Sequence, residues 1–126
     1  MYVAEALASG AGLVGPASLN HADTNVLQTT GLASWYCPRY NGRTTANREQ
    51  FDQMAMTAAH PKLPFGSLVE VTNLANGKSV KVRINDRGPY VGARIIDVSM
   101  AAAAELDFVN AGLVEVRVQL VGRIRK

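Results

Sequence analysis

Two stretches near the middle of the chain alternate between apolar and polar residues, as half-buried β-strands do. Residues 68–74 read LVEVTNL, and residues 79–85 read SVKVRIN. Between them lies the pair Asn76-Gly77, the strongest short signal for a tight turn between two antiparallel strands. The pattern therefore predicts a β-hairpin over residues 68–85.

Three further apolar stretches predict strands: residues 32–36 (LASWY), 93–98 (ARIIDV) and 113–121 (LVEVRVQLV). Between the last two, Ser99 precedes MAAAAELDF and can cap a helix there, since its hydroxyl can accept from an early backbone N–H. Alanine is the best helix former, and Gly112 is suited to the positive φ that often ends a helix. The pattern predicts a mainly β domain of short strands with one or two short helices, closed as a barrel.

The ends of the chain and residues 51–60 are less regular. We expect residues 1–30 to be a leader or linker that is partly ordered at most, because Gly, Ser, Asn and Thr recur throughout it. The barrel domain should cover residues 31–122, followed by a basic tail at 123–126. Residues 51–60 (FDQMAMTAAH) fit a short helix leading into a strand, but their periodicity does not decide between the two.

Composition narrows the classes of function. The chain has 126 residues, 48% of them hydrophobic, which suits one domain with its own core. The net charge of +3 favours an anionic polymer as partner without naming one. The basic residues are scattered and not interleaved with aromatics, so we expect no nucleic acid binding. No apolar run approaches the ~20 residues of a membrane span, and no signal peptide is visible.

The sequence contains no motif that is typical of a metal or cofactor site. Cys37 is the only cysteine, so neither an intramolecular disulfide nor a cysteine-rich metal site can form. No HExxH or CxxC spacing is present, and we predict no metal and no cofactor. Cys37 could act as a nucleophile with a histidine and an aspartate, although spacing alone does not bring such a set together.

Three ionisable residues stand out by their context. Asp86 ends the second hairpin strand beside Gly88-Pro89, where it can either stabilise a turn or exchange a proton in a cleft. Glu49 lies on a polar loop, where most glutamates are only solvated, and His60 precedes a proline, where it can equally be a half-buried structural residue. Two carboxyl groups with a histidine nearby are suited to cleaving a glycosidic bond.

Aromatic residues lie beside these polar loops. Trp35, Tyr36, Tyr40 and Tyr90 have rings that can stack on sugar faces, and their polar ends can hydrogen-bond to hydroxyls. The alternative for Trp35, as the single tryptophan of a small domain, is a place in the core.

Three segments taken together carry a resemblance: GLASWYCPRYNGRTTANREQFD, TAAHPKLPFGSLVEVTNLANGKSVKVRINDRGPY and RIIDVSMAAAAEL. In this order they resemble the rare lipoprotein A (RlpA-like) family, over about residues 31–122. The resemblance implies a six-stranded double-psi β-barrel, related to the catalytic domains of some lytic transglycosylases and to the first domain of expansins.

The resemblance also implies a function in the periplasm or at the outer membrane of bacteria: cleavage of peptidoglycan glycan strands, with cell-division or envelope proteins as further partners. By matching motifs, Asp86 becomes the expected general acid and base, and Glu49 and His60 the other polar residues of the cleft. In the expected lytic reaction one carboxyl protonates the glycosidic oxygen and then accepts the proton of the C6 hydroxyl, closing a 1,6-anhydro ring.

Substrate contacts are expected from the four aromatic residues and from Asn47, Asn85 and Arg87. Arg87 should point away from Asp86, since an ion pair would oppose a general acid. Two positions depart from the family pattern, which usually has glycine at both: Cys37 after Trp-Tyr, and Arg48 before Glu49. Arginine does not readily adopt positive φ, so Arg48 should reshape its loop or pair with Glu49. The alternative to an enzyme is a non-catalytic polysaccharide-binding or scaffold barrel.

Overall fold

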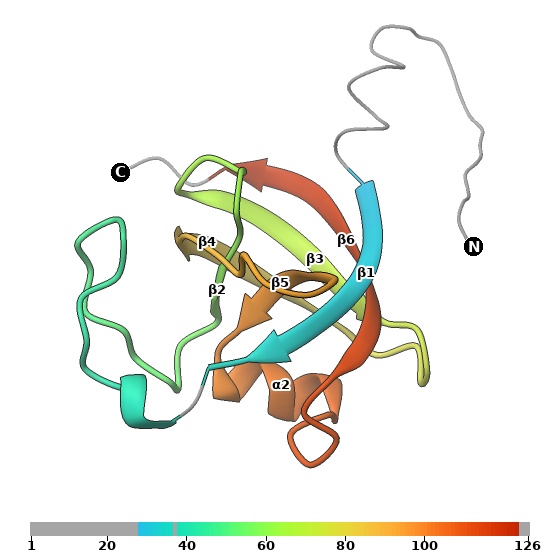
Figure 1. The fold of residues 1–126 in the computed structure, drawn as a ribbon. Coiled ribbons are helices and arrows are strands. Elements are labelled where there is room, and N and C mark those ends of the chain that lie inside the picture. The colour runs from blue at the N-terminus through green and yellow to red at the C-terminus, as the bar shows by residue number, and fades with distance from the viewer. Residues whose placement is uncertain (1–27, 37, 124–126) are drawn as a thin grey trace, which may run out of the picture.

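The computed structural model describes residues 28–36 and 38–123, which form a closed barrel of six strands (Figure 1). Most of the predicted leader, Cys37 and most of the predicted basic tail lie outside the described residues. The strands are β1 (Gln28–Trp35), β2 (Thr57–Ala59), β3 (Ser67–Asn73), β4 (Ser79–Asp86), β5 (Arg94–Val98) and β6 (Val114–Arg123). The helices are the 3-10 turn η1 (Pro38–Tyr40) and the α-helix α2 (Met100–Leu106). The prediction of a mainly β, six-stranded barrel is confirmed.

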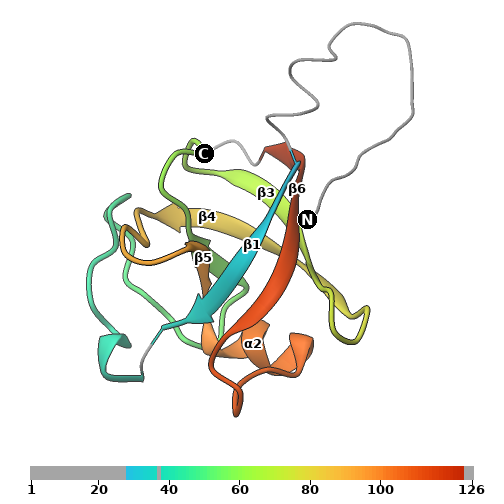
Figure 2. The ribbon, with the colours of Figure 1, turned by 45° about the vertical axis from the view of Figure 1, so that its right-hand side comes forward.

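The strands follow the order β1-β5-β2-β4-β3-β6 around the barrel, and β6 closes it against β1. Pairing is parallel between β1 and β5 and between β2 and β4, and antiparallel elsewhere. Figure 2 shows β1 and β6 crossing the barrel side by side. The short β2 therefore lies between β5 and β4, the strand that ends in the candidate residues Asn85 and Asp86.

The predicted hairpin forms from β3 and β4, which pair antiparallel from Leu68↔Arg83 to Thr72↔Ser79. Its turn is the expected one, since Gly77 has φ +80°, a conformation that glycine adopts at little cost. Alternation along β3 buries Ser67, Val69, Val71 and Asn73 and leaves the residues between them partly exposed. The periodicity in the sequence is therefore the inside-outside alternation of the barrel wall.

The core fills the barrel with branched aliphatic side chains, and α2 closes one end of it (Figures 1 and 2). Ser99 caps α2 as predicted, because its hydroxyl accepts from the backbone N–H of Ala102 at 3.2 Å. The helix ends earlier than the sequence suggested: Asp107, with φ 64°, takes the left-handed position expected of Gly112. Aspartate tolerates this conformation better than most residues.

Residues 53–56 form a turn and a bend after the irregular residues 51 and 52, so the segment that periodicity left open contains no helix before β2. Asp52 stabilises this turn by accepting from the backbone N–H of Met54 at 2.9 Å. Across the described part of the chain, no helix is both long and apolar enough to cross a membrane.

Candidate active site

A pocket of about 400 Å³ opens at the ends of β1, β4 and β5, beside the loop that joins η1 to β2. Aromatic rings, arginines and two carboxyl groups share its wall. The lining residues are Tyr36, Tyr40, Arg43, Thr44, Thr45, Phe51, Ala59, Asp86, Arg87, Gly88, Pro89, Arg94 and Asp97. Of the three predicted catalytic residues, Asp86 alone lines this pocket.

A β-bulge at the end of β4 turns Asp86 toward the pocket. Ala58 of β2 pairs with Ile84, but the next residue, Ala59, pairs with Asp86, so the register steps over Asn85. Such a bulge re-aims the side chains that follow it and is common beside active sites. As a result Asp86 is partly exposed and faces the pocket, whereas Asn85 is buried.

Three donors hold the carboxylate of Asp86. The hydroxyl of Tyr36 donates to it at 2.6 Å, and the backbone N–H groups of Ala46 and Arg87 donate to it at 2.8 and 2.9 Å. These donors come from the end of β1, from the loop before β2 and from the residue after β4. These three hydrogen bonds therefore fix the orientation of the Asp86 carboxylate at the end of β4.

Tyr36 is fixed in turn by two other rings. Its ring stacks on Phe51 with centroids 4.4 Å apart and meets Tyr40 edge-on at 6.2 Å. Burial, together with its hydrogen bond to Asp86, raises the pKa of the Tyr36 hydroxyl far above its usual range. Tyr36 is therefore a permanent donor to Asp86, and Tyr40 forms the neighbouring wall of the pocket.

Arg87 points away from Asp86, as predicted. Its guanidinium donates to the backbone carbonyls of His60 and Leu63 at 3.3 and 2.8 Å, and it stacks on the ring of Phe65 at 4.0 Å. Arginine commonly combines planar stacking with several hydrogen bonds in this way. Arg87 therefore stabilises the segment after β2, and its guanidinium points away from the carboxylate of Asp86.

Asp97 is a residue of this pocket that the sequence analysis missed. It lies on β5, and its carboxyl accepts from the hydroxyl of Ser34 at 3.0 Å, while Arg94 donates to the same hydroxyl at 2.9 Å. Burial raises the pKa of Asp97, although Ser34 and Arg94 oppose this. The available signal was an acid among the apolar residues Ile95, Ile96 and Val98 of a predicted strand.

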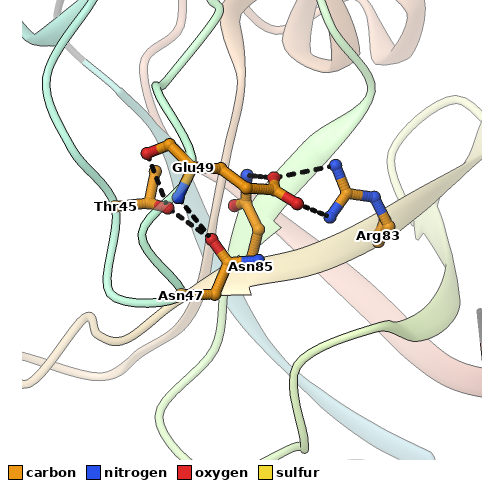
Figure 3. Close-up of polar contacts among 5 residues, drawn as sticks. All are labelled: Thr45, Asn47, Glu49, Arg83 and Asn85. Atoms are coloured by element: carbon orange, nitrogen blue, oxygen red, sulfur yellow. Dashed lines mark hydrogen bonds and ion pairs between the residues drawn. The ribbon is translucent and has the colours of Figure 1, made fainter. Parts of the chain in front are cut away.

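Glu49 lies outside the pocket lining and is engaged in a salt bridge (Figure 3). Arg83 donates to its two carboxylate oxygens at 2.8 and 2.9 Å, and the side-chain amide of Asn85 donates at 3.1 Å. These hydrogen bonds, chiefly those of Arg83, lower the pKa of Glu49 to about 2. The carboxylate is therefore held in its charged form, which suits a structural anchor better than a proton donor.

The loop that carries Glu49 is a tight turn (Figure 3). Arg48 has φ 74° and donates its N–H to the carbonyl of Thr45 at 2.9 Å. Asn47 accepts from the hydroxyl of Thr45 at 2.6 Å and from the N–H of Glu49 at 3.1 Å. Arg48 therefore adopts the positive φ expected of glycine, and the predicted contact residue Asn47 has a structural role in this turn.

His60 also has structural partners. Its Nδ1 accepts from the backbone N–H groups of Lys62 and Leu63, both at 3.0 Å, which requires a neutral ring with its proton on Nε2. Burial, with the nearby charges of Arg87 and Lys62, lowers the pKa of His60 to about 4. The histidine follows β2 close to Asp86, since its backbone N–H donates to the Asp86 carbonyl at 3.1 Å, but it does not line the pocket.

Two of the predicted aromatic contacts differ in environment. Trp35 packs against the core and donates its indole N–H to the carbonyl of Val109 at 3.2 Å, the alternative foreseen for a single tryptophan. Tyr90 is 74% exposed and follows Gly88 and Pro89 of the pocket wall. Within the described ranges, no three His, Cys, Asp or Glu side chains gather as a metal site would require.

The closed barrel of six strands, paired partly parallel and partly antiparallel, agrees with the fold that the resemblance implied. The family model of the lytic transglycolases, a double-psi β-barrel family, matches residues 28–118, and the chain belongs to this family. The predicted double-psi fold and RlpA-like membership are thereby confirmed.

Curated relatives share much of this sequence. A protein of Synechocystis named "Probable endolytic peptidoglycan transglycosylase RlpA" is 48% identical over 84% of this chain and 36% of its own length. One of the same name from Treponema pallidum is 58% identical over 74% of this chain and 29% of its own length. The chain thus spans about a third of the length of these relatives.

Solved structures are similar in fold. The Streptomyces papain inhibitor matches with a TM-score of 0.61 and 26% identity, over 75% of this chain and 94% of the inhibitor. An expansin of Clavibacter michiganensis also matches with a TM-score of 0.61, at 22% identity, over 79% of this chain and 52% of the expansin. At such identity the likeness to the expansin concerns the fold alone.

Proposed function

We propose that this chain is the catalytic barrel of a lytic transglycosylase, which cleaves the bond between MurNAc and GlcNAc in peptidoglycan glycan strands of the bacterial cell envelope. Membership of the lytic transglycolase family and relatives named endolytic peptidoglycan transglycosylases support this activity. The observation that carries the proposal is the open pocket in which Asp86 is held by Tyr36 and by the N–H of Ala46.

The reaction requires two proton transfers and no attacking water. A proton passes to the glycosidic oxygen as its bond to C1 of MurNAc breaks, which gives an oxocarbenium-like state. The C6 hydroxyl of the same sugar then loses its proton and bonds to C1, closing the 1,6-anhydro ring. Asp86, which accepts all three of its hydrogen bonds as a carboxylate would, is suited to take the proton from that hydroxyl.

The rings around the pocket are suited to hold the sugars. Tyr40 presents a ring in the pocket wall, and the guanidinium groups of Arg39 and Arg43 lie 5.5 and 5.4 Å from its centroid. Tyr90 offers a second, exposed ring beside Gly88. Rings spaced along an open pocket can stack on successive sugars of a strand, while polar tips bind hydroxyls.

The test is digestion of purified glycan strands, with and without stem peptides, followed by mass spectrometry. The protein should release fragments with 1,6-anhydro-MurNAc ends, and Asp86→Asn should lower the rate by about 10²- to 10⁴-fold, as loss of a proton-transfer group does. Asp107→Asn is the matched control, since Asp107 lies at the end of α2 and asparagine tolerates its φ of 64°. Reducing ends would identify a hydrolase, and binding without products a non-catalytic module; either outcome overturns the proposal.

A further inference from the structure

Two carboxyl groups of the pocket lie on one rung of the barrel. Ala59 of β2 pairs with Asp86 of β4 on one side and with Asp97 of β5 on the other. Residues paired across neighbouring strands point to the same face of a sheet, and all three residues line the pocket. Since strands lie about 4.8 Å apart, the α-carbons of the two acids are roughly 10 Å apart, and Ala59 lies on the strand between them.

The two acids have opposite surroundings. Asp86 is partly exposed and accepts three hydrogen bonds, from the hydroxyl of Tyr36 and from the backbone N–H groups of Ala46 and Arg87. Asp97 accepts from Ser34, and Arg94 approaches that hydroxyl from the other side. Burial outweighs these two partners and raises the pKa of Asp97, and the negative charge of Asp86 acts in the same direction. A pair of carboxyl groups in contrasting environments is the usual arrangement of an acid with a base.

We infer that Asp97 is a second catalytic residue, which donates the proton to the glycosidic oxygen while Asp86 accepts the proton of the C6 hydroxyl. The inference rests on the proposed transglycosylase function and divides between two residues the steps that the sequence alone assigned to Asp86. It follows from the shared rung, the common pocket and the different hydrogen bonds of the two acids.

The protons balance over one turnover. The O–H bond of Asp97 breaks as the leaving GlcNAc oxygen gains the proton, and the O–H bond at C6 breaks as Asp86 gains one. The C1–O6 bond replaces the glycosidic bond, so no water is consumed. Asp86 ends protonated and Asp97 ionised, and a proton returns from one to the other through solvent in the open pocket. Tyr36, whose hydroxyl contacts Asp86, keeps its own proton throughout.

The first test compares Asp97→Asn with the control Asp107→Asn on purified glycan strands. Asparagine keeps the size of the side chain and can still accept from Ser34, so thermal unfolding should show an intact fold. We expect kcat to fall by about 10²- to 10⁴-fold with KM little changed, as expected for a lost general acid. Wild-type kcat in a folded Asp97→Asn variant would overturn the inference while the wild-type products still support the proposed function.

The second test uses the pH profile and leaves Asp97 in place. Ser34→Ala removes a hydrogen bond that favours the ionised carboxylate, and Arg94→Gln removes a positive charge that does the same. Both should raise the pKa of Asp97, so the alkaline limb of kcat/KM, where the acid loses its proton, should move to higher pH. If the alkaline limb of kcat/KM lies at the wild-type pH in both variants, the inference is overturned. If the wild type releases no 1,6-anhydro products, the proposed function is overturned instead.

Discussion

Replacing Glu49 by glutamine should destabilise the barrel more than it impairs the chemistry. Arg83 binds both oxygens of this carboxylate, and the side chains of Arg83 and Glu49 are only 23% and 25% exposed. A pKa lowered from 4.5 to about 2 sets a ceiling of roughly 3 kcal/mol on the stabilisation, at about 1.4 kcal/mol for each tenfold change. Solvent screening reduces this, and we expect a loss of about 1 to 2 kcal/mol.

Thermal and urea unfolding measure the effect. A loss of this size should lower the melting temperature by roughly 5 to 10 °C at neutral pH. The pKa of Glu49 is depressed in the folded protein, so its contribution is present above the unfolded pKa of about 4.5 and lost as the pH falls toward 2. The difference between wild type and Glu49→Gln should therefore be constant from pH 7 to 5 and shrink below that.

A double-mutant cycle with Arg83→Gln isolates the pair. The losses of stability in the two single variants should together exceed the loss in the double variant, because each single change leaves one charge without its partner. Glu105→Gln, on the exposed face of α2, is the control and should change little. Two outcomes would refute a structural role for Glu49. One is that the losses of stability are additive; the other is that Glu49→Gln is as stable as the wild type but loses activity 10²-fold or more, which would indicate a catalytic role.

Two further substitutions test the surroundings of Asp86. Arg48→Gly should raise the urea midpoint by an amount equivalent to about 0.5 to 1 kcal/mol, because glycine adopts φ 74° without strain; a lower midpoint would show that the arginine side chain stabilises the loop. Tyr36→Phe removes the hydroxyl that donates to Asp86 at 2.6 Å but keeps the stack on Phe51, so kcat should fall by about 10- to 100-fold with stability nearly intact. Unchanged kcat would mean that this donor plays no part in the reaction.

The hairpin was predictable because its signals are local. Alternation over residues 68–74 and 79–85 and the turn at Asn76-Gly77 specify two strands whose pairing needs no distant contact. The cap at Ser99 was equally local. The end of α2 was misplaced because the positive φ that ends the helix was expected at Gly112. Gly112 does have φ 78°, but Asp107, with φ 64°, is already left-handed and caps the helix five residues earlier.

The polar network of the site was only partly predictable, because it depends on contacts between distant segments. Asp86 was identified from its own motif, but Glu49 forms its salt bridge with Arg83, 34 positions away in sequence, whereas the sequence suggested a pairing with the adjacent Arg48. Asp97 meets Ser34 across 63 positions, through a parallel pairing of β1 and β5 that no local pattern indicates. The sequence thus identified the strand end at the site but not the second acid facing it.

The three-residue strand β2 has a further consequence for how such a barrel can diversify. Because Ala59 pairs with the strands on both sides, main-chain hydrogen bonding, and not any side-chain choice, sets the spacing of Asp86 and Asp97. The segments that supply Tyr40, at the end of η1, and Tyr90, after β4, can change in length and composition without altering that spacing. The rings beside the pocket can therefore vary among related barrels while the backbone keeps the spacing of the two acids.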